Sequence, residues 1–300
     1  MASGPMRAAS EPSLAEMLRD YSVELAPGDS NLLDVAIERL PSRSLVSLTW
    51  IPGSDPMQMI ASAARLRHAG LLVMPHIGAR HLRSLVELEQ LAEGLMGEAG
   101  VDRVLLIGGD RATPAGPFDS SLAILRTGVF QRVGISRIAV AGFPEGNPHI
   151  PPQVLDQALA EKVEFARAEG LQLSIVTQFC FAAAPIMAWL RRLRGQGIDV
   201  PVPVRVGLAG PASLVTLIRY AMRCGVGNSL HVLTENPSFA KALVDRGPEL
   251  IIRDMIAALS HDERSRLGIA GLHFYLFGGL SKTLDWIDAV RTRRPIYAGA

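Results

Sequence analysis

A polar side chain of a type used in catalysis follows one apolar run after another along this chain. The series is Glu24, Thr49, His76, Asp110, Glu145 and Gln178. Its members lie about one strand, one helix and two short loops apart. In a parallel barrel the carboxyl ends of all strands meet at one mouth, so residues distant in sequence become neighbours there. We therefore predict an α/β fold that consists of a single (β/α)8 barrel.

The apolar runs predict strands at 22–26, 44–50, 71–76, 103–108, 137–142, 172–178, 203–208 and 271–276. Between them, residues 55–68, 82–97, 153–169 and 185–194 repeat apolar side chains at helical spacing. Residues 211–224 continue this pattern, and residues 236–259 have room for two extra helices before the eighth strand. We expect residues 1–20 to form an N-terminal extension with a short capping helix at 14–18, and residues 21–300 to form the catalytic barrel.

Composition excludes several classes of function. The chain has 300 residues, 48% of them hydrophobic, which suffices for one barrel core. A formal net charge of +1 with scattered basic residues argues against nucleic-acid binding. Cys180 and Cys224 lack metal-ligand spacing, so we expect neither a disulfide framework nor a metal site. No apolar stretch reaches the roughly 18 residues of a membrane span. We expect a cytoplasmic protein, and a homo-oligomer remains open.

Seven short motifs occur in order between about residues 21 and 290. They are Ser22-Val23-Glu24-Leu25-Ala26-Pro27, Val46-Ser47-Leu48-Thr49-Trp50, Pro75-His76, Gly109-Asp110, Phe143-Pro144-Glu145, Lys162-Val163 with Val176-Thr177-Gln178-Phe179, and His273-Phe274-Tyr275. In this order they resemble the strand-end motifs of the methylenetetrahydrofolate reductase family. The resemblance covers nearly the whole predicted barrel.

The resemblance implies reduction of 5,10-methylenetetrahydrofolate to 5-methyltetrahydrofolate, with hydride from NADH or NADPH that usually passes through bound FAD. The methylene bridge must open to a 5-iminium cation before it accepts hydride, and this opening needs a proton on N10. Glu24 is the residue that the resemblance implies as general acid. We expect apolar neighbours such as Tyr21 and Trp50 to raise the pKa of Glu24 by desolvation. The alternative is a Glu24 carboxylate paired with an arginine at the rim.

The resemblance also implies a substrate side of the site. Asp110, which is also a candidate catalytic residue, and Gln178 offer a carboxylate and an amide to the donor and acceptor edges of the pterin ring. Phe179 and Tyr275 complete this set. For Tyr275, the alternative is an aromatic residue that packs in the barrel with its hydroxyl at the rim.

The flavin side corresponds to Thr49, His76, Gly108, Gly109, Phe143, Asn147 and Lys162. Thr49, His76 and Lys162 carry groups that can bond the flavin ring and its phosphates. Their alternatives are a strand residue, a core histidine and a solvated helix lysine.

Four departures from the family pattern affect mainly this flavin side. Where the family has an arginine, a histidine and a tyrosine, this chain has Gly108, Asn147 and Phe143. Ala26-Pro27-Gly28 occupies the place of the family's Phe-Pro-Pro. The losses remove one charge-assisted contact and two hydrogen-bonding side chains. We therefore expect FAD to bind weakly or to be absent, and direct transfer of hydride from NADH or NADPH is the alternative route.

Two other classes of function stay open. A pterin-dependent methyltransferase or a phosphate-binding aldolase would use the same mouth, with Gly278-Gly279 as a phosphate cradle. Against an aldolase, no lysine suited to a Schiff base ends a predicted strand. The second class is a non-catalytic folate-binding or interaction protein that retains the barrel.

Overall fold

A computed structural model describes residues 13–50, 53, 55–195, 198, 202–260 and 263–292 of the chain. Eight parallel strands close into a barrel in sequence order, with β1 paired to β8. The strands are β1 Tyr21–Leu25, β2 Leu45–Leu48, β3 Leu72–Gly78, β4 Arg103–Ile107, β5 Arg137–Gly142, β6 Gln172–Thr177, β7 Val204–Ala209 and β8 Ile269–Tyr275. The predicted (β/α)8 barrel is confirmed.

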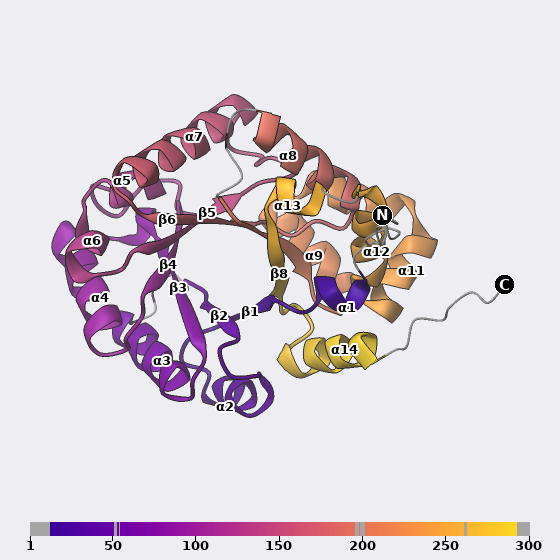
Figure 1. Ribbon diagram of the computed structural model, residues 1–300, viewed down its shortest axis with the longest axis horizontal. Helices are drawn as coiled ribbons and strands as arrows, with labels where there is room; N and C mark the ends of the chain where they lie inside the picture. Colours follow the sequence, from indigo (N-terminus) through magenta and orange to yellow (C-terminus); the bar gives the residue numbers. More distant parts are fainter. Residues whose placement is uncertain are drawn as a thin grey trace, which may run out of the picture.

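Helices surround the barrel (Figure 1). They are α1 Leu14–Met17, α2 Ser30–Arg39, α3 Pro56–His68, η1 Ala79–His81, α4 Leu85–Gly97, α5 Ser121–Leu125, α6 Val129–Val133, α7 Pro152–Ala168, α8 Ala183–Gly195, α9 Leu214–Cys224, α10 Gly227–Glu235, α11 Pro237–Arg246, α12 Glu249–Ala258, α13 Glu263–Leu267 and α14 Leu280–Thr292. Several begin at a side chain that accepts a backbone N–H of the first turn, as Asp29, Asp55, Ser84 and Ser213 do. Figure 1 shows α9, α11 and α12, in orange, gathered on one side of the barrel.

The element boundaries agree closely with the sequence-based prediction. No strand end differs from its predicted position by more than two residues. The two extra helices predicted within 236–259 are α11 and α12. The predicted capping helix is α1, which packs against α12 and α14. No residue range was predicted for α2, η1, α5, α6, α10, α13 or α14.

Strand register determines which side chains face the barrel interior. Leu45 and Met74 belong to a small apolar cluster inside the barrel, together with Leu105, Ala139 and Val176. Ser22 is in register with Leu45 and with His273, while Ser47 is in register with Met74 and with Glu24. Because residues in register share a face and faces alternate along a strand, Ser22, Glu24, Ser47 and His273 all face the interior. Tyr21, Val23 and Leu25 therefore face the helices.

Candidate functional site

Glu24 meets two histidines inside the barrel. Strands β1, β3 and β8 bring Glu24 Oε2 to 3.9 Å from His76 Nε2 and to 3.8 Å from His273 Nε2. Both imidazoles are buried, whereas the Glu24 side chain keeps 21% of its surface exposed. Neither Nε2 atom has a hydrogen-bond partner among the described residues. Of these three residues, Glu24 is therefore the one that a ligand at the mouth can reach.

The pKa of Glu24 is lowered, so the predicted upward shift is wrong. Burial raises this pKa, but the neighbouring imidazoles of His273 and His76 outweigh it. The expected apolar neighbours lie elsewhere. Tyr21 faces the helix layer, where its ring packs edge-on against Phe274 at 6.1 Å. The Trp50 ring lies 6.2 Å from that of His81. Nor is the arginine of the alternative interpretation found beside Glu24 among the described residues.

His76 was predicted to contact the flavin, and the structure places it beside Glu24. Its Nε2 faces Glu24, and burial lowers the pKa of His76 to about 4 against the opposing pull of the Glu24 charge. The ring is therefore neutral at neutral pH and offers no charge to a phosphate. The alternative of a core histidine fits its burial, although its Nε2 has no partner among the described residues.

Ser22 and Tyr275 hold the ring of His273. Ser22 Oγ lies 2.9 Å from His273 Nδ1, and the Tyr275 ring packs edge-on against the imidazole at 4.9 Å. The Tyr275 hydroxyl donates to the Thr177 carbonyl at 3.0 Å, and burial raises its pKa well above the usual range. A Cβ at Gly207 would come within 2.9 Å of the Tyr275 ring, so this strand position needs glycine. Tyr275 thus packs in the barrel, as the alternative interpretation stated.

An aromatic cluster supports the same side of the mouth. Phe179 packs against Phe181, Tyr275 and Phe277, and Tyr220 of α9 stacks on Phe277 with ring centroids 3.9 Å apart. Phe179, which was predicted to contact the substrate, has no exposed surface. Tyr220 and Phe277 remain half-buried and present aromatic surface instead.

Gln178 and Asp110 follow the carboxyl ends of β6 and β4 but have different surroundings. Gln178 is half-buried, and its Oε1 accepts the Phe179 N–H at 3.0 Å. Its amide nitrogen donates to none of the described residues. Asp110 is 69% exposed and lies 2.7 Å from Nε2 of the buried His81 on η1. Sequence reasoning missed His81, although a second histidine just beyond His76 was a usable signal.

The two glycines after β4 both contact η1, but only Gly109 lies too close to it for a side chain. Arg80 N–H donates to the Gly108 carbonyl at 2.8 Å, and a Cβ at Gly109 would approach the His81 ring to 2.9 Å. Gly109 has a φ of 95°, a conformation that favours glycine. Thr49, directly after β2, is half-buried and donates its backbone N–H to the Leu25 carbonyl at 2.9 Å.

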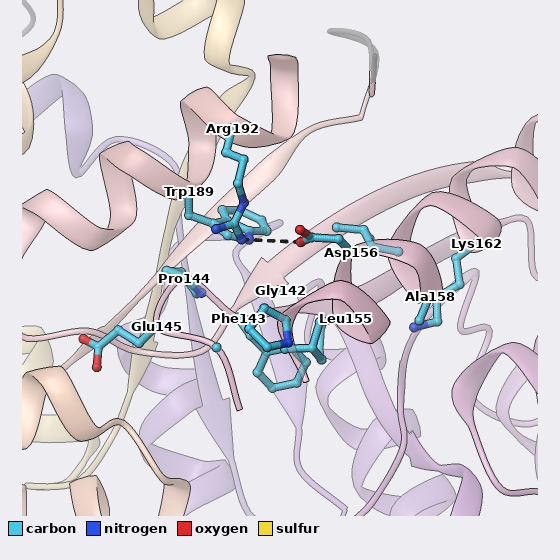
Figure 2. Close-up of a pocket in the computed structure, with 14 residues that line it drawn as sticks. Gly142, Phe143, Pro144, Glu145, Leu155, Asp156, Ala158, Lys162, Trp189 and Arg192 are labelled. Carbon is cyan, nitrogen blue, oxygen red and sulfur yellow. Dashed lines mark hydrogen bonds and ion pairs between the residues drawn. The ribbon is translucent and has the colours of Figure 1, made fainter. Parts of the chain in front are cut away.

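Phe143 and Lys162 line a separate cavity of about 200 Å³ between the loop after β5 and helices α7 and α8 (Figure 2). Lys162 is half-buried, and burial lowers its pKa. Arg192 of α8 reaches Asp156 of α7 at 3.4 Å, shown as the dashed line in Figure 2. The Glu145 side chain points away from Lys162 in this view.

The predicted flavin-side residues have different surroundings, and two of them, Phe143 and Lys162, line the cavity beside α7 and α8. His76 faces Glu24, and Gly109 packs against η1. The Gly108 carbonyl accepts the Arg80 N–H, and Asn147 accepts the His149 N–H at 2.9 Å within its own turn. The cavity beside Lys162 is smaller than the roughly 300–1,000 Å³ usual for a drug-sized ligand. That cavity alone is therefore too small for a complete FAD.

The described ranges contain neither a cluster of metal ligands nor a helix that could span a membrane. No group of three or more His, Cys, Asp or Glu side chains there is arranged to hold a metal ion. In the same ranges, no helix has both the length and the apolar character to cross a bilayer. Cys180 and Cys224 are free thiols.

Comparison with known proteins supports the fold. No model of a known protein family matches the chain. The structure is similar, with a TM-score of 0.57 and 11% identity, to an uncharacterized protein from Clostridium thermocellum that binds two copies of 5-methyl-5,6,7,8-tetrahydrofolic acid. That likeness covers 90% of this chain and 94% of the other. A 3-dehydroquinate dehydratase from Geobacillus kaustophilus HTA426 has a TM-score of 0.45 and 12% identity, over 93% of this chain and 92% of the other. At such identities the likeness extends to the barrel fold alone.

Proposed function

We propose that this protein reduces 5,10-methylenetetrahydrofolate to 5-methyltetrahydrofolate, with NADH or NADPH as the source of hydride and Glu24 as the proton donor. The observation that carries the proposal is the Glu24 carboxyl at the barrel mouth, backed by two buried imidazoles within 3.9 Å. The similar Clostridium thermocellum barrel binds 5-methyltetrahydrofolic acid, the product of this reaction, which supports a folate ligand.

In the proposed reaction Glu24, Gln178 and Asp110 have different roles. The Glu24 carboxyl gives its proton to N10 as the bond between N10 and the methylene carbon breaks, and the 5-iminium cation that results accepts hydride at that carbon. The amide nitrogen of Gln178 offers a donor to the pterin carbonyl. Asp110 stays a proposed partner for the pterin amino group, because its exposed carboxylate has accepting capacity beyond the contact with His81.

We propose that hydride passes directly from the nicotinamide to the folate. The different surroundings of the predicted flavin-side residues support this route. The expected result is NADH- or NADPH-dependent reduction by protein whose visible spectrum shows no flavin bands. Activity that appears only after FAD is added would contradict the direct route.

The test of Glu24 is the isosteric variant Glu24→Gln. We expect it to bind 5-methyltetrahydrofolate about as well as the wild type and to lower the reduction rate by at least about 100-fold, the lower range for a general acid. Glu93→Gln, at an exposed position of α4, is the matched control. Binding is measured by titration calorimetry and reduction by single-turnover oxidation of NADH. Equal losses of binding and rate would assign Glu24 a structural role instead.

A folate-binding protein without turnover is the second candidate. The lowered pKa of Glu24 favours it, since a carboxylate that has already lost its proton cannot donate one. The two candidates differ in a simple experiment in which enzyme, NADH and methylenetetrahydrofolate are mixed in equal amounts. Reduction of the folate supports the reductase, and binding without reduction supports the second candidate.

A further inference from the structure

The cavity between the loop after β5 and helices α7 and α8 contains a lysine that lacks a direct partner (Figure 2). Lys162 of α7 lines this space of about 200 Å³ and is half-buried. Its ammonium donates no hydrogen bond to any of the described residues. The adjacent Glu161 attracts it, but the Glu161 carboxylate is already bonded to Gln157 at 3.0 Å and to Arg126 at 3.4 Å.

The other charged side chains around the cavity have partners. Arg192 lies 3.4 Å from Asp156 across the space between α8 and α7. Glu145 accepts the Ser229 N–H at 2.9 Å, and its side chain points away from Lys162 in Figure 2. Among the described residues that line the cavity, Lys162 alone therefore carries a charge without a direct contact to the opposite charge. An ammonium that is partly removed from water is costly unless an anion meets it.

Apolar side chains form the walls beside Lys162. Leu155, Leu159 and Lys162 recur at helical spacing, so they share one side of α7. The half-buried Phe143 from the loop after β5 and the ring of Trp189 from α8, which is 4% exposed, line the same space. The cavity thus combines one unpaired positive charge with aromatic and aliphatic surface.

We propose that this cavity binds a small carboxylic acid with an apolar body, whose carboxylate pairs with Lys162 while the body packs against Phe143 and Trp189. An ionised acceptor bonds an ammonium more strongly than a neutral one does, which favours the carboxylate over its amide. The volume lies below the roughly 300–1,000 Å³ usual for a drug-sized ligand, so the ligand is of the size of benzoate. This site is independent of the proposed function, because it lies in the helix layer outside the barrel.

The first test compares benzoate with its neutral isostere benzamide. In protein labelled with nitrogen-15 at its three tryptophans, the indole signal of Trp189 is assigned by its loss in Trp189→Phe. We expect benzoate to shift this signal in a saturable way and to bind at least about tenfold more tightly than benzamide, because a hydrogen bond to a charged group is the stronger one. Equal affinities, or no saturable shift of this signal, would overturn the proposal.

The second test removes the charge. Lys162→Gln should weaken benzoate binding by at least about tenfold and leave benzamide binding unchanged, whereas Lys162→Arg should retain most of the affinity for benzoate. Lys241→Gln, at an exposed position of α11, is the matched control. Undiminished benzoate binding in Lys162→Gln would contradict the site, and so would inorganic phosphate that binds more tightly than benzoate, since the apolar walls would then contribute nothing. If Lys162→Gln does not fold, the comparison of benzoate with benzamide in the wild type decides.

The third test separates this cavity from the barrel mouth. We expect 5-methyltetrahydrofolate not to displace benzoate, and Glu24→Gln to bind benzoate as the wild type does. Displacement by the folate would place benzoate at the mouth and overturn the proposal. A protein that binds benzoate at Lys162 but reduces no folate would refute the proposed function and leave this site intact.

Discussion

Two serines on the interior face of the barrel have opposite surroundings. Ser22 on β1 and Ser47 on β2 are both without exposed surface. Ser22 Oγ lies 2.9 Å from His273 Nδ1, whereas Ser47 Oγ has no hydrogen-bond partner among the described residues. A buried hydroxyl that lacks a partner costs roughly 1–3 kcal/mol, while a bonded one contributes to stability. The serine hydroxyl therefore stabilises the fold at Ser22 and destabilises it at Ser47.

The two alanine variants should differ accordingly. We expect Ser22→Ala to lower the free energy of unfolding by about 1–3 kcal/mol, because Nδ1 of the buried His273 loses its partner. Ser47→Ala should leave it unchanged or raise it by up to about 1 kcal/mol, since a desolvated hydroxyl is removed. Urea unfolding at neutral pH measures both. A loss in Ser47→Ala as large as that in Ser22→Ala would show that the Ser47 hydroxyl has a partner, such as an internal water.

At the scale of elements, α10 is fastened to the barrel by one side chain from the loop after β5. Glu145 accepts the Ser229 backbone N–H at 2.9 Å and also accepts the Ser229 hydroxyl. The Ser229 oxygen in turn accepts the Phe181 N–H at 2.7 Å from the loop after β6. A carboxylate at the first turn of a helix is also favoured by the helix dipole. Three segments distant in sequence thus share one polar contact.

Ser229→Ala should loosen α10 and little else. Because it removes partners from both Glu145 and the Phe181 N–H, we expect the free energy of unfolding to fall by about 1–3 kcal/mol. Amide hydrogen exchange should accelerate within 227–235 while the strands keep their protection. Thr234→Ala, at an exposed position near the end of the same helix, is the control. Unchanged exchange in α10 would show that apolar packing alone holds it.

The contrast between strands and α10 shows what could be predicted from the sequence. Each strand is an apolar run bounded by polar or turn residues, so local pattern suffices to place it. Helix α10 begins with Gly227, Asn228 and Ser229, which resemble a turn, and its anchor lies 84 residues earlier. Glu24 and His76 were both predicted at the barrel mouth from the ends of their apolar runs, and they lie 3.9 Å apart near the carboxyl ends of β1 and β3. His273 received no role, since its contact with Ser22 spans 251 residues and depends on register.

At the scale of the whole molecule, the buried His76 makes stability depend on pH. The pKa of His76 is about 4 in the folded protein, whereas that of an ordinary histidine, as in the unfolded chain, is 6.5. Between these two pH values the unfolded chain binds a proton at His76 and the folded chain does not. Stability therefore falls as pH drops from 6.5 towards 4. Glu24 acts in the same direction, because its lowered pKa means that protonation favours the unfolded chain in acid.

We expect the free energy of unfolding to decrease by up to about 3 kcal/mol over this pH range through His76 alone, at about 1.36 kcal/mol for each unit of pKa difference. His76→Asn should flatten this dependence, whereas His231→Gln, at an exposed position, should not. Urea unfolding at a series of pH values makes the measurement. An equally steep dependence in His76→Asn would show that other groups cause the loss of stability in acid.

The pairing of β1 with β8 also has a consequence for the newly made chain. Ser22 leaves the ribosome before its partner His273, which follows 251 residues later. At roughly 5–20 residues per second, the interval is about 10–50 s. Throughout it, Ser22 and Glu24 remain without the imidazole that completes their surroundings. The surroundings of Glu24 are therefore completed in a single late step of folding, when β8 pairs with β1.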